Sequence, residues 1–349
     1  MSDGLNERSR QILEAIIEDH IDSAEPVGSR AVTRRHPLGL SPATVRNVMA
    51  DLEDLGYLCS PHTSAGRVPT EKGYRFYVDT LLKVRPLSDA EQLGIASQYQ
   101  LKGLPMEELL RQAGQVLSGL SRYAGVVLAP RVATTVFRHI EFVRLSQGRI
   151  LVVLVTRSGL VQNKLIESDD TPSQSELDQI SNYLNQILSG LTLPQIRQKL
   201  LEEMSQEKAL YDQLLGRALR LSEEAFGGDM EEKVFIEGTS NILDQPEFAD
   251  VGRMRRLFRT FEQKSQLLDL LDKSQQAQGV QIFIGSESEY HEIEGCSLVT
   301  STYGLRGGAV GSIGVIGPSR MPYSMVIPIV DYTARLITQV LNGTTSQER

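Results

Sequence analysis

The chain has 349 residues, enough for two or three domains, and its 40% hydrophobic and 23% charged residues are ordinary values for a soluble globular protein. The formal net charge is −8, so any basic patch stands against an acidic background. The two cysteines, Cys59 and Cys296, lie far apart and no Cys/His metal spacing exists, which argues against structural zinc and favours a reducing compartment.

No segment suggests a membrane. The polar start, residues 1–6, lacks the apolar core of a signal peptide, and no apolar run approaches the roughly 20 residues of a membrane span. We therefore expect a cytoplasmic protein without a membrane partner.

The first 40 residues predict two helices. The first runs from about residue 6 to 21, because apolar residues recur there at helical spacing, namely Ile12, Leu13, Ile16, Ile17, His20 and Ile21. Pro26 disfavours helix at Glu25 and so separates it from a short second helix, Ser29 to Arg35.

A third helix starts after Ser41, which can cap it, and Pro42 suits its first position. Its predicted buried face consists of Val45, Val48, Met49, Leu52 and Leu55. The opposite face carries Ala43, Arg46, Asn47, Ala50 and Asp54. Gly56 ends the helix by supplying a left-handed position.

This third helix has the residue types of a DNA-reading helix. Arg46 offers a fork for guanine, Asn47 can pair with adenine, and small neighbours allow close approach to a groove. Residues 26–50 contain four arginines and no acidic residue, which favours phosphate contact over an ordinary solvated surface. These arginines are Arg30, Arg34, Arg35 and Arg46.

Two short extended runs follow, at residues 57–60 and 67–70. The loop between them is rich in hydroxyl groups and turn residues, and Gly66 is expected to take a positive φ. A solvated hairpin tip is one interpretation of the loop alone. Directly after a helix-turn-helix pair, a DNA-binding wing is the better one.

The stretches V-R-N-V-M-A-D-L-E-D-L-G-Y-L and P-H-T-S-A-G-R-V-P-T-E-K-G-Y-R-F-Y-V-D together resemble the HrcA family of bacterial heat-inducible transcription repressors. The resemblance and the local chemistry give one set of candidate DNA-binding residues: Ser29, Arg30, Arg34, Ser41, Ala43, Thr44, Arg46, Asn47, His62, Thr63, Ser64, Gly66 and Arg67.

Farther along, helical and sheet patterns alternate. Thr70 begins an aromatic-rich helix to Leu82, followed by a linker at 84–88 and helical patterns at 89–99 and 106–123. Strand patterns at 125–129, 136–145, 150–156 and 160–166 predict an antiparallel meander. Helices are expected between 171 and 219 and between 254 and 271, with a short strand at 234–237. The last strands fall at 280–284, 296–303 and 309–316, before a closing helix at 322–341.

We predict an α+β multidomain protein. The resemblance implies an N-terminal winged helix-turn-helix (1–83), a linker and helix (84–104), and a GAF-like antiparallel sheet domain in two parts (105–171 and 276–349). A mainly helical inserted dimerisation domain (172–275) would interrupt the latter. The residues themselves show only the alternation of sheet and helix.

Other motifs carry little chemistry. A glycine cluster at 304–314 lacks the spacing of a phosphate loop and is better interpreted as a hairpin turn, and the five histidines lack catalytic contexts. We therefore expect no enzyme, cofactor or metal. A second basic run is more consistent with a solvated or interface helix face than with nucleic-acid binding, and it comprises Arg253, Arg255, Arg256, Arg259 and Lys264.

The expected function is sequence-specific repression by a homodimer that reads an inverted repeat on double-stranded DNA. The resemblance implies the CIRCE operator of chaperone genes and the GroEL chaperonin as a partner that modulates activity. The alternative is a regulator gated by a small ligand in the GAF-like domain. A nucleic-acid or chaperone-binding adaptor without an operator is a third class.

Overall fold

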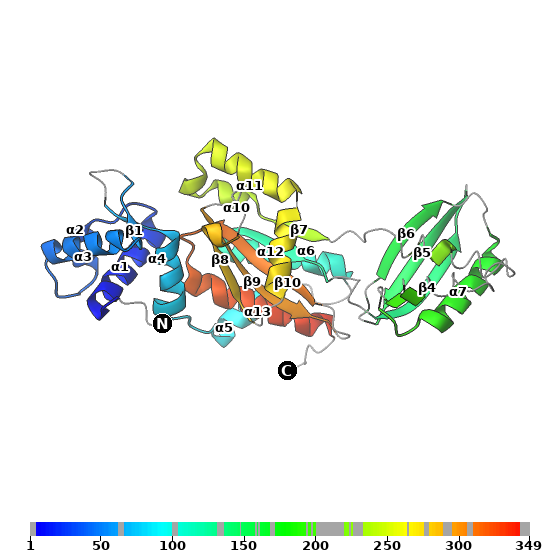
Figure 1. The fold of residues 1–349 in the computed structure, drawn as a ribbon. Helices are drawn as coiled ribbons and strands as arrows, with labels where there is room; N and C mark the ends of the chain where they lie inside the picture. The colour runs from blue at the N-terminus through cyan, green and yellow to red at the C-terminus, as the bar shows by residue number, and fades with distance from the viewer. Residues whose placement is uncertain are drawn as a thin grey trace. The chain divides into compact units, whose positions relative to one another are not determined.

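The computed structural model describes residues 5–61, 66–99, 104–130, 136–146, 148–157, 159, 161–167, 172–192, 195–196, 198–199, 220–222, 225, 233–263, 265–275, 279–288, 295–305 and 310–342. The chain divides into two compact units (Figure 1). The first comprises Met1–Leu128, Val234–Thr302 and Ser312–Ile337, and the second Ala129–Lys233, Tyr303–Gly311 and Thr338–Arg349. No helix in the described part of the chain is long and apolar enough to cross a membrane.

Three helices begin the first unit: α1 (Glu7–Ser23), α2 (Ser29–Arg35) and α3 (Pro42–Asp54). Side chains cap two of them, because Asn6 accepts a hydrogen bond from Ser9 N (2.9 Å) and Ser41 accepts one from Thr44 N (3.1 Å). Their shared core is fully buried and consists of Ile12, Leu13, Ile16, Ile17, Val32, Val45 and Leu52. The predicted buried faces of these helices are confirmed except at Ile21 and Val48, which are half-buried, and at Leu55, which follows the end of α3 and is 51% exposed.

An antiparallel two-stranded ribbon follows α3. Strand β1 (Leu58–Cys59) pairs with β2 (Val68–Pro69). Thr70 then caps α4 (Glu71–Phe76), which continues as a π-helical turn, η1 (Tyr77–Leu81). The sequence predicted one helix over this stretch, and the change of winding within it had no visible signal.

The larger sheet has the strand order β7-β3-β10-β9-β8. Its strands are β3 (Ala124–Leu128), β7 (Val234–Glu237), β8 (Gln281–Ile284), β9 (Cys296–Gly304) and β10 (Val310–Pro318). Strand β3 pairs antiparallel with both β7 and β10, so segments more than 100 residues apart in sequence form its centre. Five of the predicted strands therefore lie in this sheet.

Helices cover both faces of this sheet. On one face, α10 (Ser240–Leu243), η4 (Pro246–Phe248), α11 (Val251–Gln263) and α12 (Ser265–Gln275) share a core with β3, β9 and β10. On the other lie α6 (Met106–Ser121) and α13 (Tyr323–Leu341). Helix α6 packs closely on β3, since a Cβ at Gly125 would lie 2.2 Å from Gly114 O. Helix α5 (Asp89–Ala96) begins with a capping box at Ser88, directly after the predicted linker, and falls within the helical pattern predicted at 89–99.

The second unit contains a three-stranded antiparallel sheet of β4 (Phe137–Arg144), β5 (Arg149–Thr156) and β6 (Val161–Glu167). Helix α7 (Gln174–Leu188) packs on one face, where Leu177, Ile180 and Leu184 meet alternate residues of the strands. The expected meander is confirmed for these three strands, but β3 belongs to the other sheet. Most of the helical pattern at 194–219 lies outside the described residues.

The domain boundaries differ from those predicted. Strands β4–β6 were assigned to the interrupted domain but lie in the interrupting unit, which begins at Ala129 and ends at Lys233. Helices α10–α12 were assigned to the insertion but pack on the five-stranded sheet. The physical reason is that an amphipathic pattern shows that a face is buried, but not which sheet covers it.

Candidate nucleic-acid interface

The solvent face of α3 carries the side chains expected to read bases. Arg46 and Asn47 are exposed, and so are Ala43 and Ala50 one turn away on either side. Because Val45, Met49 and Leu52 anchor the opposite face in the core, the exposed face is held rigidly. At the start of the helix, Ser41 is exposed and Thr44 is half-buried, with 3.0 Å between their hydroxyl oxygens.

Helix α2 packs against α3 and adds positive charge (Figure 1). Arg30 and Arg34 are exposed and lie one turn apart, and neither forms an ion pair within the described residues. Arg35 differs, because its Nη1 lies 3.1 Å from Asp19 Oδ1. Ser29 is only 7% exposed, so its side chain packs inside rather than toward a partner.

Arg67 and Gly66 have structural partners in the ribbon. The backbone of Arg67 exchanges two hydrogen bonds with Val27, each 2.9 Å, and its Nε lies 2.8 Å from Glu53 Oε2 at the end of α3. A Cβ at Gly66 would lie 2.4 Å from Val27 O, so glycine is needed there for space. The loop residues His62, Thr63 and Ser64 lie outside the described residues.

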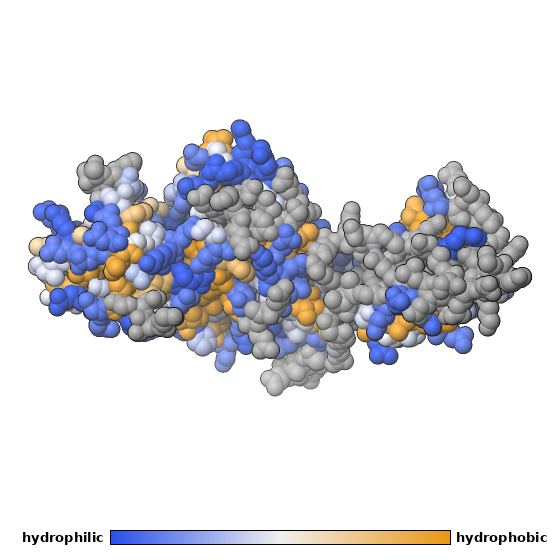
Figure 2. Space-filling model, viewed as in Figure 1, coloured by the Kyte–Doolittle hydropathy of each residue, from blue (hydrophilic) through white to orange (hydrophobic). Residues whose placement is uncertain are grey.

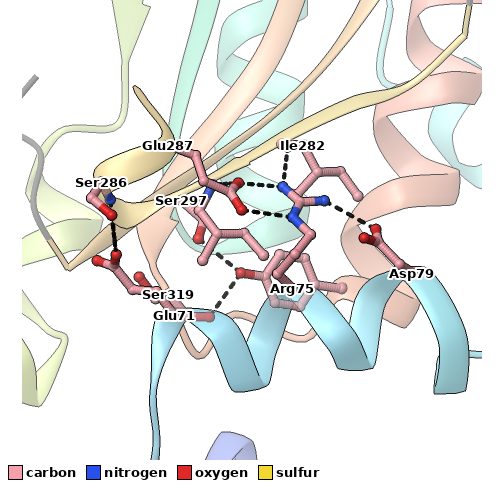
Figure 3. Close-up of polar contacts among 10 residues, drawn as sticks. Glu71, Arg75, Asp79, Ile282, Ser286, Glu287, Ser297 and Ser319 are labelled. Atoms are coloured by element: carbon pink, nitrogen blue, oxygen red, sulfur yellow. Dashed lines mark hydrogen bonds and ion pairs between the residues drawn. The ribbon is translucent and has the colours of Figure 1, made fainter. Parts of the chain in front are cut away.

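Helix α4 ties this module to the five-stranded sheet (Figure 3). Arg75 donates to Glu287 from Nε (2.8 Å) and Nη2, and Nη2 also donates to Ile282 O (2.6 Å). One turn earlier, Glu71 accepts hydrogen bonds from Ser286 N (3.0 Å) and Oγ (2.5 Å). Burial alone would raise the pKa of Glu287, but hydrogen bonds from Arg75 and Ile284 N outweigh it and lower that pKa.

A second contact joins the end of α1 to the sheet. Arg320 pairs with Glu247 and donates from Nη1 to Ile21 O (3.1 Å). Nearby, His20 Nδ1 lies 2.7 Å from the Tyr74 hydroxyl. Burial, followed by the charge of Arg320, lowers the pKa of His20. His20 was expected at the edge of the core, and it is half-buried there.

These contacts were missed in the sequence. Arg75 and Asp79 have the i, i+4 spacing of a helical ion pair, and their 3.1 Å contact could have been predicted. No local pattern indicates the stronger partner, Glu287, because it lies more than 200 residues away in sequence. Among the described residues, no group of three or more His, Cys, Asp and Glu side chains could hold a metal ion.

Known proteins resemble this chain over most of its length. Residues 107–327 match the family model described as HrcA protein C terminal domain. A heat-inducible transcription repressor HrcA from Geobacter sulfurreducens is 58% identical over 339 residues, which cover 97% of this chain and 99% of that protein. One of the same name from Syntrophobacter fumaroxidans is 46% identical over 343 residues, 98% of each chain. A crystal structure titled only as a hypothetical protein is 24% identical, covers 98% of this chain and all of that one, and has a TM-score of 0.65.

Proposed function

The chain belongs to the HrcA family of heat-inducible transcription repressors, and from this premise we propose that it represses chaperone genes by binding an inverted-repeat operator as a homodimer. The observation that carries the proposal is the solvent face of α3, where Arg46 and Asn47 stand exposed between small residues. Such a helix fits the major groove, where arginine recognises guanine and asparagine recognises adenine. Binding to the chromosome would place its work in the cytoplasm.

In this proposal residues 1–83 act as a winged helix-turn-helix. Helix α3 reads bases and α2 contacts phosphates through Arg30 and Arg34. The ribbon is the wing, and His62, Thr63 and Ser64 at its tip contact the backbone or the minor groove. Ser41, Ala43, Thr44, Gly66 and Arg67 line or support this surface, whereas Ser29 serves it by packing.

An open apolar sheet face supports the homodimer. The face of β4–β6 opposite α7 carries Val143, Leu151 and Leu165 in one row and Val155 and Val161 in another. Val161 and Leu165 lie on the same face of β6, on either side of Asn163, and are 55% and 49% exposed. We infer that a second copy covers this face, and that two reading helices related by a two-fold axis then match an inverted repeat.

We further propose a CIRCE-type operator and modulation by GroEL. Support comes from the five-stranded sheet, a GAF-like domain in this proposal, in which β3 lies between β7 and β10 and pairs with both, although they are far along the chain. Such non-local pairing folds slowly and exposes apolar strands meanwhile, which makes a client for a chaperonin. A repressor that needs chaperonin to fold reports how much chaperonin is free.

The decisive experiment measures affinity of the full chain for an inverted-repeat library over a range of salt concentrations. We expect one repeat to bind at least about 10³-fold more tightly than scrambled DNA. Equal affinity for both would leave an adaptor without an operator. Release of the operator by a small molecule in the absence of GroEL would favour a ligand-gated regulator instead.

A second experiment tests the chaperonin. We expect refolding at heat-shock temperature to be incomplete alone and to recover operator binding when GroEL is added. Complete spontaneous refolding, with binding unchanged by GroEL, would contradict this part of the proposal and leave the DNA-binding part intact.

A further inference from the structure

Helix α11 presents a second basic surface on the first unit. Four arginines of this 13-residue helix are exposed, while Leu257 and Phe261 anchor its other side in the core of the five-stranded sheet. We call these four the α11 arginine face: Arg253, Arg255, Arg256 and Arg259. Figure 2 shows mainly hydrophilic residues over the upper part of the unit, where Figure 1 draws α11.

Within the described residues, the charge of this face is only partly offset, through the electrostatic interaction of Asp250 with Arg253 and Arg256. None of the four guanidinium groups forms an ion pair there. The adjacent acidic residue, Asp250, is occupied as a helix cap, since its Oδ1 accepts a hydrogen bond from Arg253 N (2.7 Å). That backbone hydrogen bond lowers the pKa of Asp250. Only Glu262 adds a further exposed negative charge on the helix. Positive charge is thus concentrated on a chain whose formal net charge is −8.

The spacing of these arginines suits a phosphate backbone. At about 100° per residue, Arg255, Arg256 and Arg259 fall within an arc of about 100°. At 1.5 Å per residue, Arg255 and Arg259 are about 6 Å apart along the axis. That distance spans about two phosphates of one DNA strand. Arginine binds phosphate through two parallel hydrogen bonds from its planar guanidinium group. A charge that only kept the surface soluble would not need this geometry.

A chain of contacts connects α11 to the proposed DNA-reading module. Helix α11 begins three residues after η4, whose Glu247 pairs with Arg320. Arg320 also holds Ile21 O at the end of α1. In Figure 1, α11 lies at the upper edge of the part of this unit that contains the five-stranded sheet.

We propose that the α11 arginine face binds the phosphate backbone of DNA that flanks the operator. This inference rests on the proposed function, because it adds contacts to the same protein–DNA complex. The contacts are sequence-independent, so they raise affinity without changing which bases are read. An acidic protein surface is the competing partner, and the experiment below separates the two.

The test compares Arg255→Gln/Arg259→Gln with the matched double variant Arg138→Gln/Arg144→Gln, which removes the same charge from exposed positions on β4. Each full chain is titrated with a duplex containing only the inverted repeat, and with one extended by about 20 base pairs on each side, about two helical turns. We expect the unmodified chain to bind the longer duplex more tightly. The α11 variant should lose most of that gain in affinity. Its salt slope, the slope of the logarithm of the binding constant against the logarithm of the salt concentration, should decrease in magnitude by about 1.8, or 0.9 per lost contact.

An unchanged salt slope and unchanged affinity for the longer duplex would overturn the inference, and so would an equal loss on both duplexes or an equal loss in the β4 control. Retained DNA binding with lost capture of an acidic protein would assign the face to that partner instead. If the unmodified chain fails to distinguish operator from scrambled DNA, the proposed function fails. In that case, the salt slopes of the unmodified chain and the α11 variant on long unrelated DNA still show whether the α11 arginine face binds phosphates. Thermal unfolding of each variant verifies that it is folded.

Discussion

Arg46 is the residue on which we expect base recognition to depend most. Its side chain is exposed and without an ion pair in the described part of the chain, so it is available to a base. Arg46→Ala should weaken operator binding by about 1–3 kcal/mol if the guanidinium makes a two-pronged contact with guanine. Affinity for operator and scrambled duplexes should become more alike. Arg8→Ala, an exposed arginine on α1, is the control, and equal effects of the two variants would remove Arg46 from base reading.

Glu287 carries a prediction about stability and pH. Its pKa is lowered in the folded chain by Arg75 and Ile284 N, so its stabilising contribution exists above its unfolded pKa and is lost as pH falls. Glu287→Gln should reduce the free energy of unfolding by about 1 kcal/mol near pH 7, since the pair is only partly buried. The difference from the unmodified chain should shrink below about pH 4. Asp79→Asn is the control on the more exposed side of Arg75, and a constant difference across pH would contradict the assignment.

At the scale of elements, Arg67 in the ribbon can have a structural role, a DNA-binding role or both. The sequence makes Arg67 a candidate DNA-binding residue of the wing, whereas the structure pairs its guanidinium with Glu53. If Arg67 serves only to hold the ribbon against α3, Arg67→Ala and Glu53→Gln should weaken DNA binding to a similar, small extent without changing the salt slope. If it also contacts phosphate, Arg67→Ala alone should lower that slope by about 0.9. Binding measured at several salt concentrations separates the two roles.

The elements themselves were largely predictable from sequence. Caps at Ser41 and Thr70, the turn glycine Gly56 and regular apolar spacing located α1 to α4 and most strands to within a few residues. These signals are local, and local chemistry determines where a helix or strand begins. The partner of each strand is not local, which is why β3 was grouped with β4 although it pairs with β7 and β10.

The same distinction applies to the candidate interface. Exposure of Arg46 and Asn47 follows from helical periodicity and was predicted correctly. The ion pairs of Arg67 with Glu53 and of Arg75 with Glu287 join residues from different elements, so no spacing rule reveals them. The positive φ expected at Gly66 is wrong. Glycine is needed there for space instead, because of Val27 across the bridge, and no local pattern shows that contact.

For the whole molecule, the open face of the three-stranded sheet predicts how copies associate. Leu165→Glu would place a charge in the apolar surface that we infer is buried between two protomers, which costs several kcal/mol in an interface. We expect the variant to sediment as a monomer and to bind a half-site and a full inverted repeat with similar affinity. Leu93→Glu, on the 70%-exposed Leu93 of α5, should remain dimeric. A dimeric Leu165→Glu variant would exclude this face as the contact.

The longest segment of the second unit, Ala129–Lys233, leaves and rejoins the five-stranded sheet at neighbouring strand ends. Leu128 is the register partner of Val234, and one residue farther out Ala129 N donates to Lys233 O (2.9 Å). The segment between them is therefore an insertion that connects the ends of two paired strands, β3 and β7. A tight turn of a few residues could join Leu128 to Val234 without disturbing the ladder, because hairpins close over such distances. Evolution could lengthen, trade or delete the intervening body while the sheet and the DNA-reading helices stayed as they are.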